Sequence, residues 1–134
     1  MNDLVVIPTI ENYQIPKVHC SAKDGICQIE GESYMEHAAR FYKGILDWID
    51  SYFATFDDRR LEFHFRLHYF NTASTLGLTK ILFKLQSARE KGKDITVRWY
   101  FKDPDDDMVE SEGRDLAEEV GINMEFIPYV SSKV

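Results

Sequence analysis

The stretch HFRLHYFNTASTLGLTKILFKLQ, residues 64–86, changes its periodicity in the middle. In its first part apolar and polar residues alternate, which is the pattern of a β-strand with one buried face. After Asn71 apolar residues recur every three or four positions, the pattern of an amphipathic helix. Three hydroxyl residues follow the change directly: Thr72, Ser74 and Thr75. The stretch therefore predicts a strand that leads straight into a helix, with hydroxyl groups at the joint.

Two predicted strands indicate a sheet that is covered on one side. Residues 61–69 place on one face Leu61, Phe63, Phe65, Leu67 and Tyr69. The other face carries Glu62, His64, Arg66 and His68, and residues 95–101 add to it Arg98 and Tyr100. A doubly wound sheet would have near-continuous apolar strands instead. We therefore expect a two-layer α/β sandwich with the helices mainly on one face. The polar face is then exposed to solvent or forms a contact surface.

The other elements follow from the same periodicities. Residues 1–16 are expected to be an extended lead-in, and short strands are expected over residues 17–21 and 26–30. A helix is expected over residues 72–91, a strand over 95–101, a helix over 108–120 and a last strand over 124–129. Because helices separate the last three strands, these strands should run parallel. The prediction is one domain over residues 1–134 with three helices and a mixed sheet of about five strands.

The sequence SYME at residues 33–36 has the form of a capping box, in which Ser33 and Glu36 each bond the other's backbone N–H. We expect the first helix to begin there. Its apolar positions recur at three and four: Phe41, Ile45, Trp48, Ile49, Tyr52 and Phe53.

Composition excludes several classes of protein. The chain has 134 residues, with 16 basic and 23 acidic side chains and a net charge of −7, which disfavours binding to a nucleic-acid backbone. No stretch approaches the ~20 apolar residues that a membrane span needs, and the N-terminus lacks the features of a signal peptide. We expect a cytoplasmic protein with no membrane and no nucleic-acid partner.

The two cysteines flank a predicted hairpin. Cys20 and Cys27 face each other if the turn is centred on Lys23-Asp24, but they are offset if the turn uses Asp24-Gly25, which is the stronger hairpin signal. Because cytosolic proteins rarely keep structural disulfides, we expect free, reduced thiols.

The hydroxyl group at the joint has two interpretations. Asn71 or Thr72 can be an ordinary N-cap that stabilises the helix by about 1 kcal/mol. Alternatively, Thr72 can accept a phosphoryl group, which the positive end of the helix dipole favours. A phosphate-binding loop is not indicated, because the turn lacks a glycine-rich run and a lysine.

Four segments resemble the SiaC-type biofilm regulation phosphoproteins, a family similar to the STAS domains of anti-sigma-factor antagonists. They are SYMEHAARFYKGILDWIDSYF, LEFHFRLHYFNTAST, ITVRWYFKDPDDDMVESEGRDLAEE and NMEFIPY, and the resemblance extends from about Ile7 to Tyr129. It implies a STAS-like fold. The family commonly has Asn-Thr-Ser-Ser where this chain has Asn-Thr-Ala-Ser.

The resemblance also implies a non-catalytic switch. In that family a dedicated protein kinase phosphorylates the threonine, a PP2C-type phosphatase restores it, and the unmodified form binds a target such as a diguanylate cyclase. Carried over to this chain, the acceptor is Thr72, and the partner-binding residues are Asn71, Thr72, Ala73, Ser74 and Tyr34. Ala73 stands where the family commonly has a serine, so one candidate hydroxyl is absent and Thr72 remains as the expected phosphorylation site.

No catalytic, cofactor or metal site is indicated. His64 and His68 are four residues apart, which is about 13 Å on a strand and too far for one ion. His19, Cys20, Cys27 and His37 have no recognised ligand spacing. The segment DPDDD at 103–107 lacks the glycine and glutamate of a calcium loop, so we expect an exposed, metal-free acidic loop. Two alternatives remain: a constitutive interaction or dimerisation module that uses the polar sheet face, and a small phosphate-handling enzyme.

Overall fold

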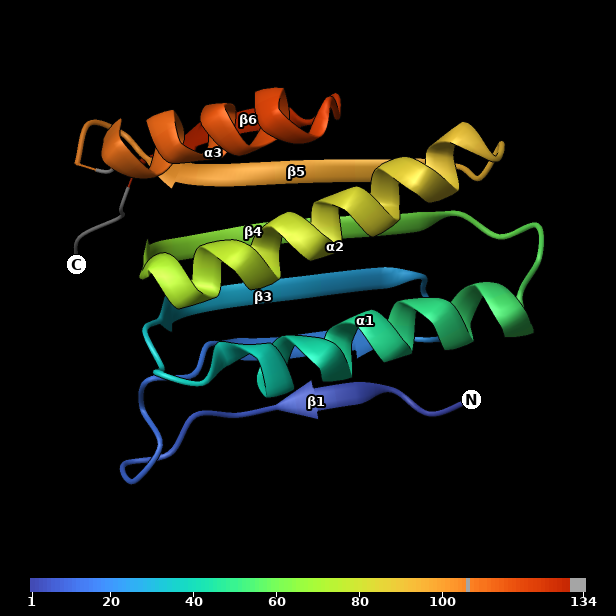
Figure 1. Cartoon of the computed structure of the whole chain (residues 1–134), viewed down its shortest axis with the longest axis horizontal. Helices are drawn as coiled ribbons and strands as arrows, with labels where there is room; N and C mark the ends of the chain where they lie inside the picture. The colour runs from blue at the N-terminus through green and yellow to red at the C-terminus, as the bar shows by residue number, and fades with distance from the viewer. Residues whose placement is uncertain (106, 131–134) are drawn as a thin grey trace.

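The computed structural model describes residues 1–105 and 107–130, which form one sheet and three helices (Figure 1). In chain order the elements are β1 (Leu4–Val6), β2 (Lys17–Ser21), β3 (Ile26–Ser33), α1 (Ala38–Thr55), β4 (Leu61–Phe70), α2 (Thr72–Glu90), β5 (Ile95–Lys102), α3 (Asp107–Val120) and β6 (Glu125–Tyr129). The strand-to-helix joint predicted from the opening stretch is confirmed, with Asn71 between β4 and α2.

The strands lie in the sheet in the order in which they occur in the chain, β1 to β6. The pairs β1–β2 and β2–β3 are antiparallel. The pairs β3–β4, β4–β5 and β5–β6 are parallel, as the intervening helices predicted. Because parallel strands end at the same edge of a sheet, the joint after β4 lies beside the end of β3.

The three helices cover the same face of the sheet, so the predicted two-layer α/β sandwich is confirmed (Figure 1). The core lies between the layers. Its largest fully buried side chains are Trp99, Tyr42, Tyr52, Phe63, Phe65, Ile29, Ile45, Ile49, Leu61, Leu67, Leu78 and Ile81. Within the described residues, no helix combines the length and the apolar character that crossing a bilayer requires.

The sheet has six strands rather than about five, because the expected lead-in contains β1. Its three residues pair with β2, and Leu4 packs on the core. A three-residue apolar run has too little periodicity to be distinguished from an extended tail.

The capping-box prediction is wrong. Ser33 is the last residue of β3 and is fully buried, whereas α1 begins at Ala38 after His37, which makes no side-chain cap bond. The hydroxyl of Ser33 is used by tertiary contacts with α1 and α2, and these contacts outweigh a local cap.

Tyr69 does not lie on the apolar face, contrary to the alternation. The pairing of β3 with β4 shifts between Gly31 and Glu32: Gly31 pairs with Leu67, but Glu32 pairs with Tyr69. The irregularity leaves Tyr69 half exposed and turns the next residue, Phe70, into the core, where it packs against Trp99. A bulge redirects side chains in this way without ending the strand.

The cysteines are not free thiols. Cys20 lies directly opposite Cys27 in the hairpin, and the two form a disulfide. The hairpin loop has four residues, 22–25, and ends at Gly25, whose φ is +67° and whose N–H donates to the carbonyl of Ser21 at 2.9 Å. The register is that of a turn centred on Lys23-Asp24, so the two-residue Asp24-Gly25 turn does not form.

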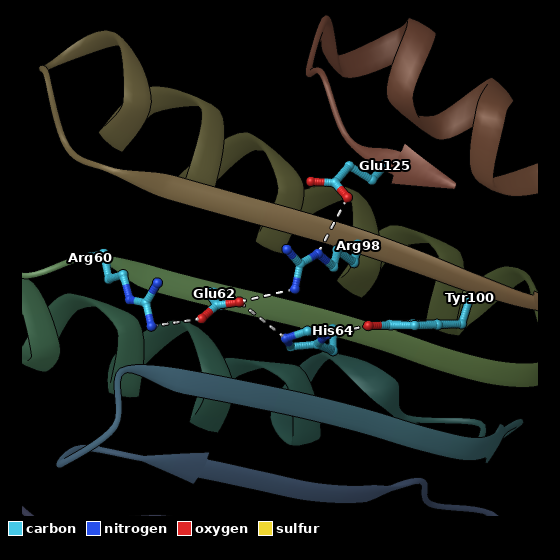
Figure 2. A network of polar contacts seen from close by, with 6 residues as sticks. All are labelled: Arg60, Glu62, His64, Arg98, Tyr100 and Glu125. Atoms are coloured by element: carbon cyan, nitrogen blue, oxygen red, sulfur yellow. Dashed lines mark hydrogen bonds and ion pairs between the residues drawn. The ribbon is translucent and has the colours of Figure 1, made fainter. Parts of the chain in front are cut away.

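The uncovered face of the sheet carries a connected polar network (Figure 2). At its centre is the carboxylate of Glu62, which lies 3.2 Å from the Arg98 guanidinium, 3.3 Å from Arg60 and 3.7 Å from His64. Arg98 also reaches Glu125 at 3.4 Å, and His64 Nδ1 lies 2.8 Å from the Tyr100 hydroxyl. The charges of this face are thus satisfied mainly by one another.

Candidate functional site

Thr72 is the first residue of α2 and lies at the carboxyl edge of the parallel strands. It is exposed. The first-turn N–H groups of a helix carry a partial positive charge, and the first turn of α2 contains no acidic residue. The position therefore combines access to the hydroxyl with an environment that favours an added anion.

Asn71, not Thr72, caps α2. Its side-chain oxygen accepts a hydrogen bond from the Ser74 N–H at 2.9 Å, and its carbonyl accepts from the Thr75 N–H at 2.9 Å. Its side-chain amide donates to the carbonyl of Met35 at 3.2 Å, and its own N–H donates to the carbonyl of Ser33 at 3.0 Å. Asn71 is thus fixed at the joint, and the cap does not need the Thr72 hydroxyl.

Three buried hydroxyl groups form hydrogen bonds with one another on the core side of the joint. The Ser33 oxygen lies 2.6 Å from the Ser74 oxygen and 2.7 Å from the Tyr42 hydroxyl, and the Ser74 hydroxyl also donates to the Ser33 carbonyl at 2.9 Å. Burial raises the pKa of Tyr42, so its phenol stays neutral. The cluster connects the end of β3, the first half of α1 and the first turn of α2.

The predicted site residues consequently divide into two groups. Thr72 is exposed, and Asn71 and Ala73 are half-buried at the surface. Ser74 is fully buried, so its hydroxyl acts inside the joint and is not available to a partner. Sequence periodicity alone could not separate Ser74 from its neighbours, because its burial depends on Ser33, 41 residues earlier.

Tyr34 belongs to an aromatic cluster beside the joint. Its ring centroid lies 6.0 Å from that of Tyr13 and 6.1 Å from that of Tyr69. Tyr13 and Tyr69 are 59% and 50% exposed. The cluster was not predicted, because it needs the bulge that turns Tyr69 outward and a backbone bond from the Tyr34 N–H to the Gln14 carbonyl at 3.0 Å.

Ala73 connects the joint to a hollow between α1 and α2. The hollow has a volume of about 440 Å³, and its lining includes Tyr42, Ala73, Leu76 and Gly77. Sequence analysis missed it. The available signal was the apolar Leu76, which is outside the core stripe of α2 and is 57% exposed.

The described part of the chain contains no group of three or more His, Cys, Asp or Glu side chains placed to hold a metal ion. Within the predicted acidic loop, Asp103, Pro104, Asp105 and Asp107 are exposed, and Asp106 lies outside the described residues. His64 is engaged by the carboxylate of Glu62 and by the Tyr100 hydroxyl.

Comparisons with known proteins identify the family and the fold of this chain. A family model described as "SiaC family regulatory phosphoprotein" matches residues 10–129. An uncharacterized protein of Pseudomonas aeruginosa strain UCBPP-PA14 is 29% identical over 101 residues, which are 75% of this chain and 77% of that protein.

Two solved structures have a similar fold. The crystal structure of apo-SiaC from Pseudomonas aeruginosa is 26% identical and aligns with a TM-score of 0.77 over 97% of this chain and 100% of that one. The structure of the diguanylate cyclase SiaD in complex with its activator SiaC, from the same species, contains a chain that is 24% identical, with a TM-score of 0.85 over 95% of this chain and 100% of that one. Because the family model covers most of the sequence, this chain belongs to the SiaC family of regulatory phosphoproteins.

Proposed function

We propose that this chain is a non-catalytic signalling regulator that is switched by reversible phosphorylation of Thr72. The observation that carries the proposal is that Asn71 and Thr72 have different roles at the joint. Asn71 caps α2, while Thr72 is exposed. The chain can gain or lose a phosphoryl group there without losing a contact of the fold. The helix end should favour the phosphate by roughly 0.3–1 kcal/mol.

The proposed partners are a protein kinase, a PP2C-type phosphatase and a target protein, and the proposed compartment is the cytoplasm. The target is a diguanylate cyclase, by extension from the solved complex in which SiaC activates SiaD. The unphosphorylated form binds the target through Thr72, Asn71, Ala73 and Tyr34, with Ser74 holding the joint in place. We also propose that residues 1–134 act as one domain, since one sheet joins β1 to β6.

Phosphorylation acts on binding rather than on folding. A phosphoryl group adds about −1.5 to −2 charges at neutral pH. An unpaired charge that a partner surface must desolvate is expensive, so the complex should be weakened by several kcal/mol.

The test uses the cognate kinase and ATP, with intact-mass analysis of the product. The wild-type chain should gain one phosphoryl group and Thr72→Ala should gain none. Ser87→Ala is the matched control, because Ser87 is another exposed hydroxyl on α2. Thr72→Asp should fold normally and bind the cyclase poorly. Phosphorylation of Thr72→Ala at the wild-type rate would refute the assignment of the acceptor, and equal cyclase binding by both forms would refute the switch.

A further inference from the structure

The helices α1 and α2 lie side by side and run in the same direction (Figure 1), and two hollows lie between them. The hollow beside Ala73 has a volume of about 440 Å³, and a second hollow of about 570 Å³ lies further along the helices. Leu46 of α1 and Lys80 of α2 line both, so the two hollows form one depression, here called the docking groove. It extends from Glu36, just before α1, to Phe53 on α1.

Apolar side chains line the docking groove on both helices. On α2, Leu76 and Phe83 are 57% and 51% exposed and lie seven residues apart, on the same side of the helix. On α1, Leu46 and Phe53 have the same seven-residue spacing and are half-buried. Apolar side chains that recur along a helix at the surface are a feature of interaction sites.

The docking groove is positively charged although the chain as a whole carries −7. Five lysines line it, Lys43, Lys80, Lys84, Lys91 and Lys93, against two lining carboxylates, Glu36 and Asp50, and Lys43 is also paired with Asp47 beside the lining at 2.8 Å. Lys84 is paired with Asp50 at 2.8 Å, and Lys93 with Asp57 at 2.8 Å. Lys80 and Lys91 are exposed and form no ion pair with a described residue. Two cations are thus available to a partner.

We infer that the docking groove binds an amphipathic α-helix of the target protein, with apolar residues every three or four positions and Asp or Glu beside them. The stretch of α1 from Ala38 to Phe53 corresponds to about 23 Å at ~1.5 Å per residue, or about four helical turns. Apolar anchors in a groove with flanking charges are the recognition mode of helix-in-groove complexes. The inference rests on the proposed function, since it identifies the surface on which the target docks.

The position of Thr72 at one end of the docking groove explains how a phosphate would control it. Thr72 precedes Ala73, which lines the groove. A phosphoryl group of about −1.5 to −2 charges would offset most of the charge of Lys80 and Lys91, the two groove lysines that form no ion pair with a described residue. The lysines of the groove would then attract an acidic helix less strongly. The phosphate at Thr72 would also repel the acidic side chains of that helix at this end of the groove.

The experiment is calorimetric titration of the full-length chain with a purified diguanylate cyclase of the SiaD type. Lys80→Glu and Phe83→Ala are the test variants. Arg40→Glu is the matched control for charge, because Arg40 is exposed on α1 and is not part of the groove lining. Met108→Ala is the control for size, because Met108 is 71% exposed on α3. Circular dichroism checks that each variant is folded.

Each test variant should weaken cyclase binding at least tenfold, and both controls should bind within twofold of wild type. Added salt should weaken wild-type binding more than it weakens binding by Lys80→Glu. If the test variants bind like the controls while phosphorylation of Thr72 still abolishes binding, the docking groove is wrong and the proposed switch stands. If the test variants lose binding while phosphorylation has no effect, the groove stands and the switch is wrong. A wild-type chain that does not bind the cyclase overturns both.

Discussion

The ring of Tyr42 on α1 packs directly on Gly77 of α2, in the space that a side chain at residue 77 would occupy. A Cβ built at Gly77 would overlap Cβ, Cγ and Cδ2 of Tyr42. The missing side chain therefore sets how closely the two helices approach. It also holds the Tyr42 hydroxyl within reach of Ser33, at 2.7 Å.

Gly77→Ala should destabilise the fold by about 1–3 kcal/mol, because an overpacked core must displace its neighbours. This cost outweighs the ~1 kcal/mol by which alanine is normally preferred to glycine in a helix. Gly44→Ala is the matched control: Gly44 is exposed on α1, and a Cβ there meets nothing within 4 Å. That variant should be more stable than wild type. Urea unfolding followed by circular dichroism measures the free energy of unfolding of both variants. Changes of the same sign would contradict the close packing of Tyr42 on Gly77.

Ser33→Ala should cost about 1–3 kcal/mol, because it removes a hydroxyl that contacts both the buried Tyr42 hydroxyl and the buried Ser74 hydroxyl. Tyr42→Phe should cost less, about 1 kcal/mol, since Ser33 keeps its contact with Ser74. The exposed hydroxyl provides the contrast: Thr72→Ala should change the free energy of unfolding by less than about 0.5 kcal/mol. In a double-mutant cycle, the losses of unfolding free energy caused by Ser33→Ala and by Tyr42→Phe should add up to more than the loss measured for the double variant. Strict additivity would show that the two hydroxyls do not interact.

Glu62→Gln should destabilise the sheet by about 1–3 kcal/mol, because it removes the central charge from three cationic or titratable partners. The side chain of Glu62 is only 11% exposed, whereas that of Glu125 is 60% exposed (Figure 2). Glu125→Gln removes the other carboxylate next to Arg98 and should cost less than about 1 kcal/mol. Chemical denaturation measures the free energy of unfolding of both variants. Equal losses in the two variants would refute a central role for Glu62.

His64 should make the protein less stable at mildly acidic pH. Burial lowers the pKa of His64 below its ordinary value of 6.5; Arg98 and Arg66 act in the same direction, and Glu62 opposes them. The folded state therefore binds fewer protons at His64 than the unfolded chain does. Stability is complete above the unfolded pKa and is lost as the pH falls from there through the lower folded pKa.

The comparison is between wild type and His64→Gln, unfolded with urea at about pH 7.5 and about pH 5.5, on either side of the ordinary histidine pKa. The wild type should lose more stability on acidification than the variant. An NMR titration of the His64 ring should give a midpoint below 6.5. A midpoint above this value would reverse the sign and refute the prediction.

Periodicity was sufficient to predict most of the fold. The bounds of α2 and β5 and the uncovered polar face follow from residue spacing alone, and Gly92, with a φ of +93°, lies where α2 ends. These features depend on neighbours within one element.

The predictions that failed depend on residues far apart in sequence. Ser33 has a good local capping pattern, but its hydroxyl is taken by Tyr42 and Ser74. Tyr69 leaves the apolar face because of an irregularity in its pairing with Glu32 on β3. Cys20 pairs with Cys27 because a four-residue loop replaces the shorter turn. In each case a tertiary contact or a register outweighs the local signal.

The sequential order of the strands has a consequence for how the chain folds. Each strand pairs with the strand that precedes it, so no pairing has to wait for a distant part of the chain. Folding is faster when contacts are local in sequence, and the N-terminal part of a chain is the first to be synthesised. Ser33, Tyr42 and Ser74 all precede β5. The joint between β4 and α2 can therefore assemble on the ribosome while β5, α3 and β6 are still being translated.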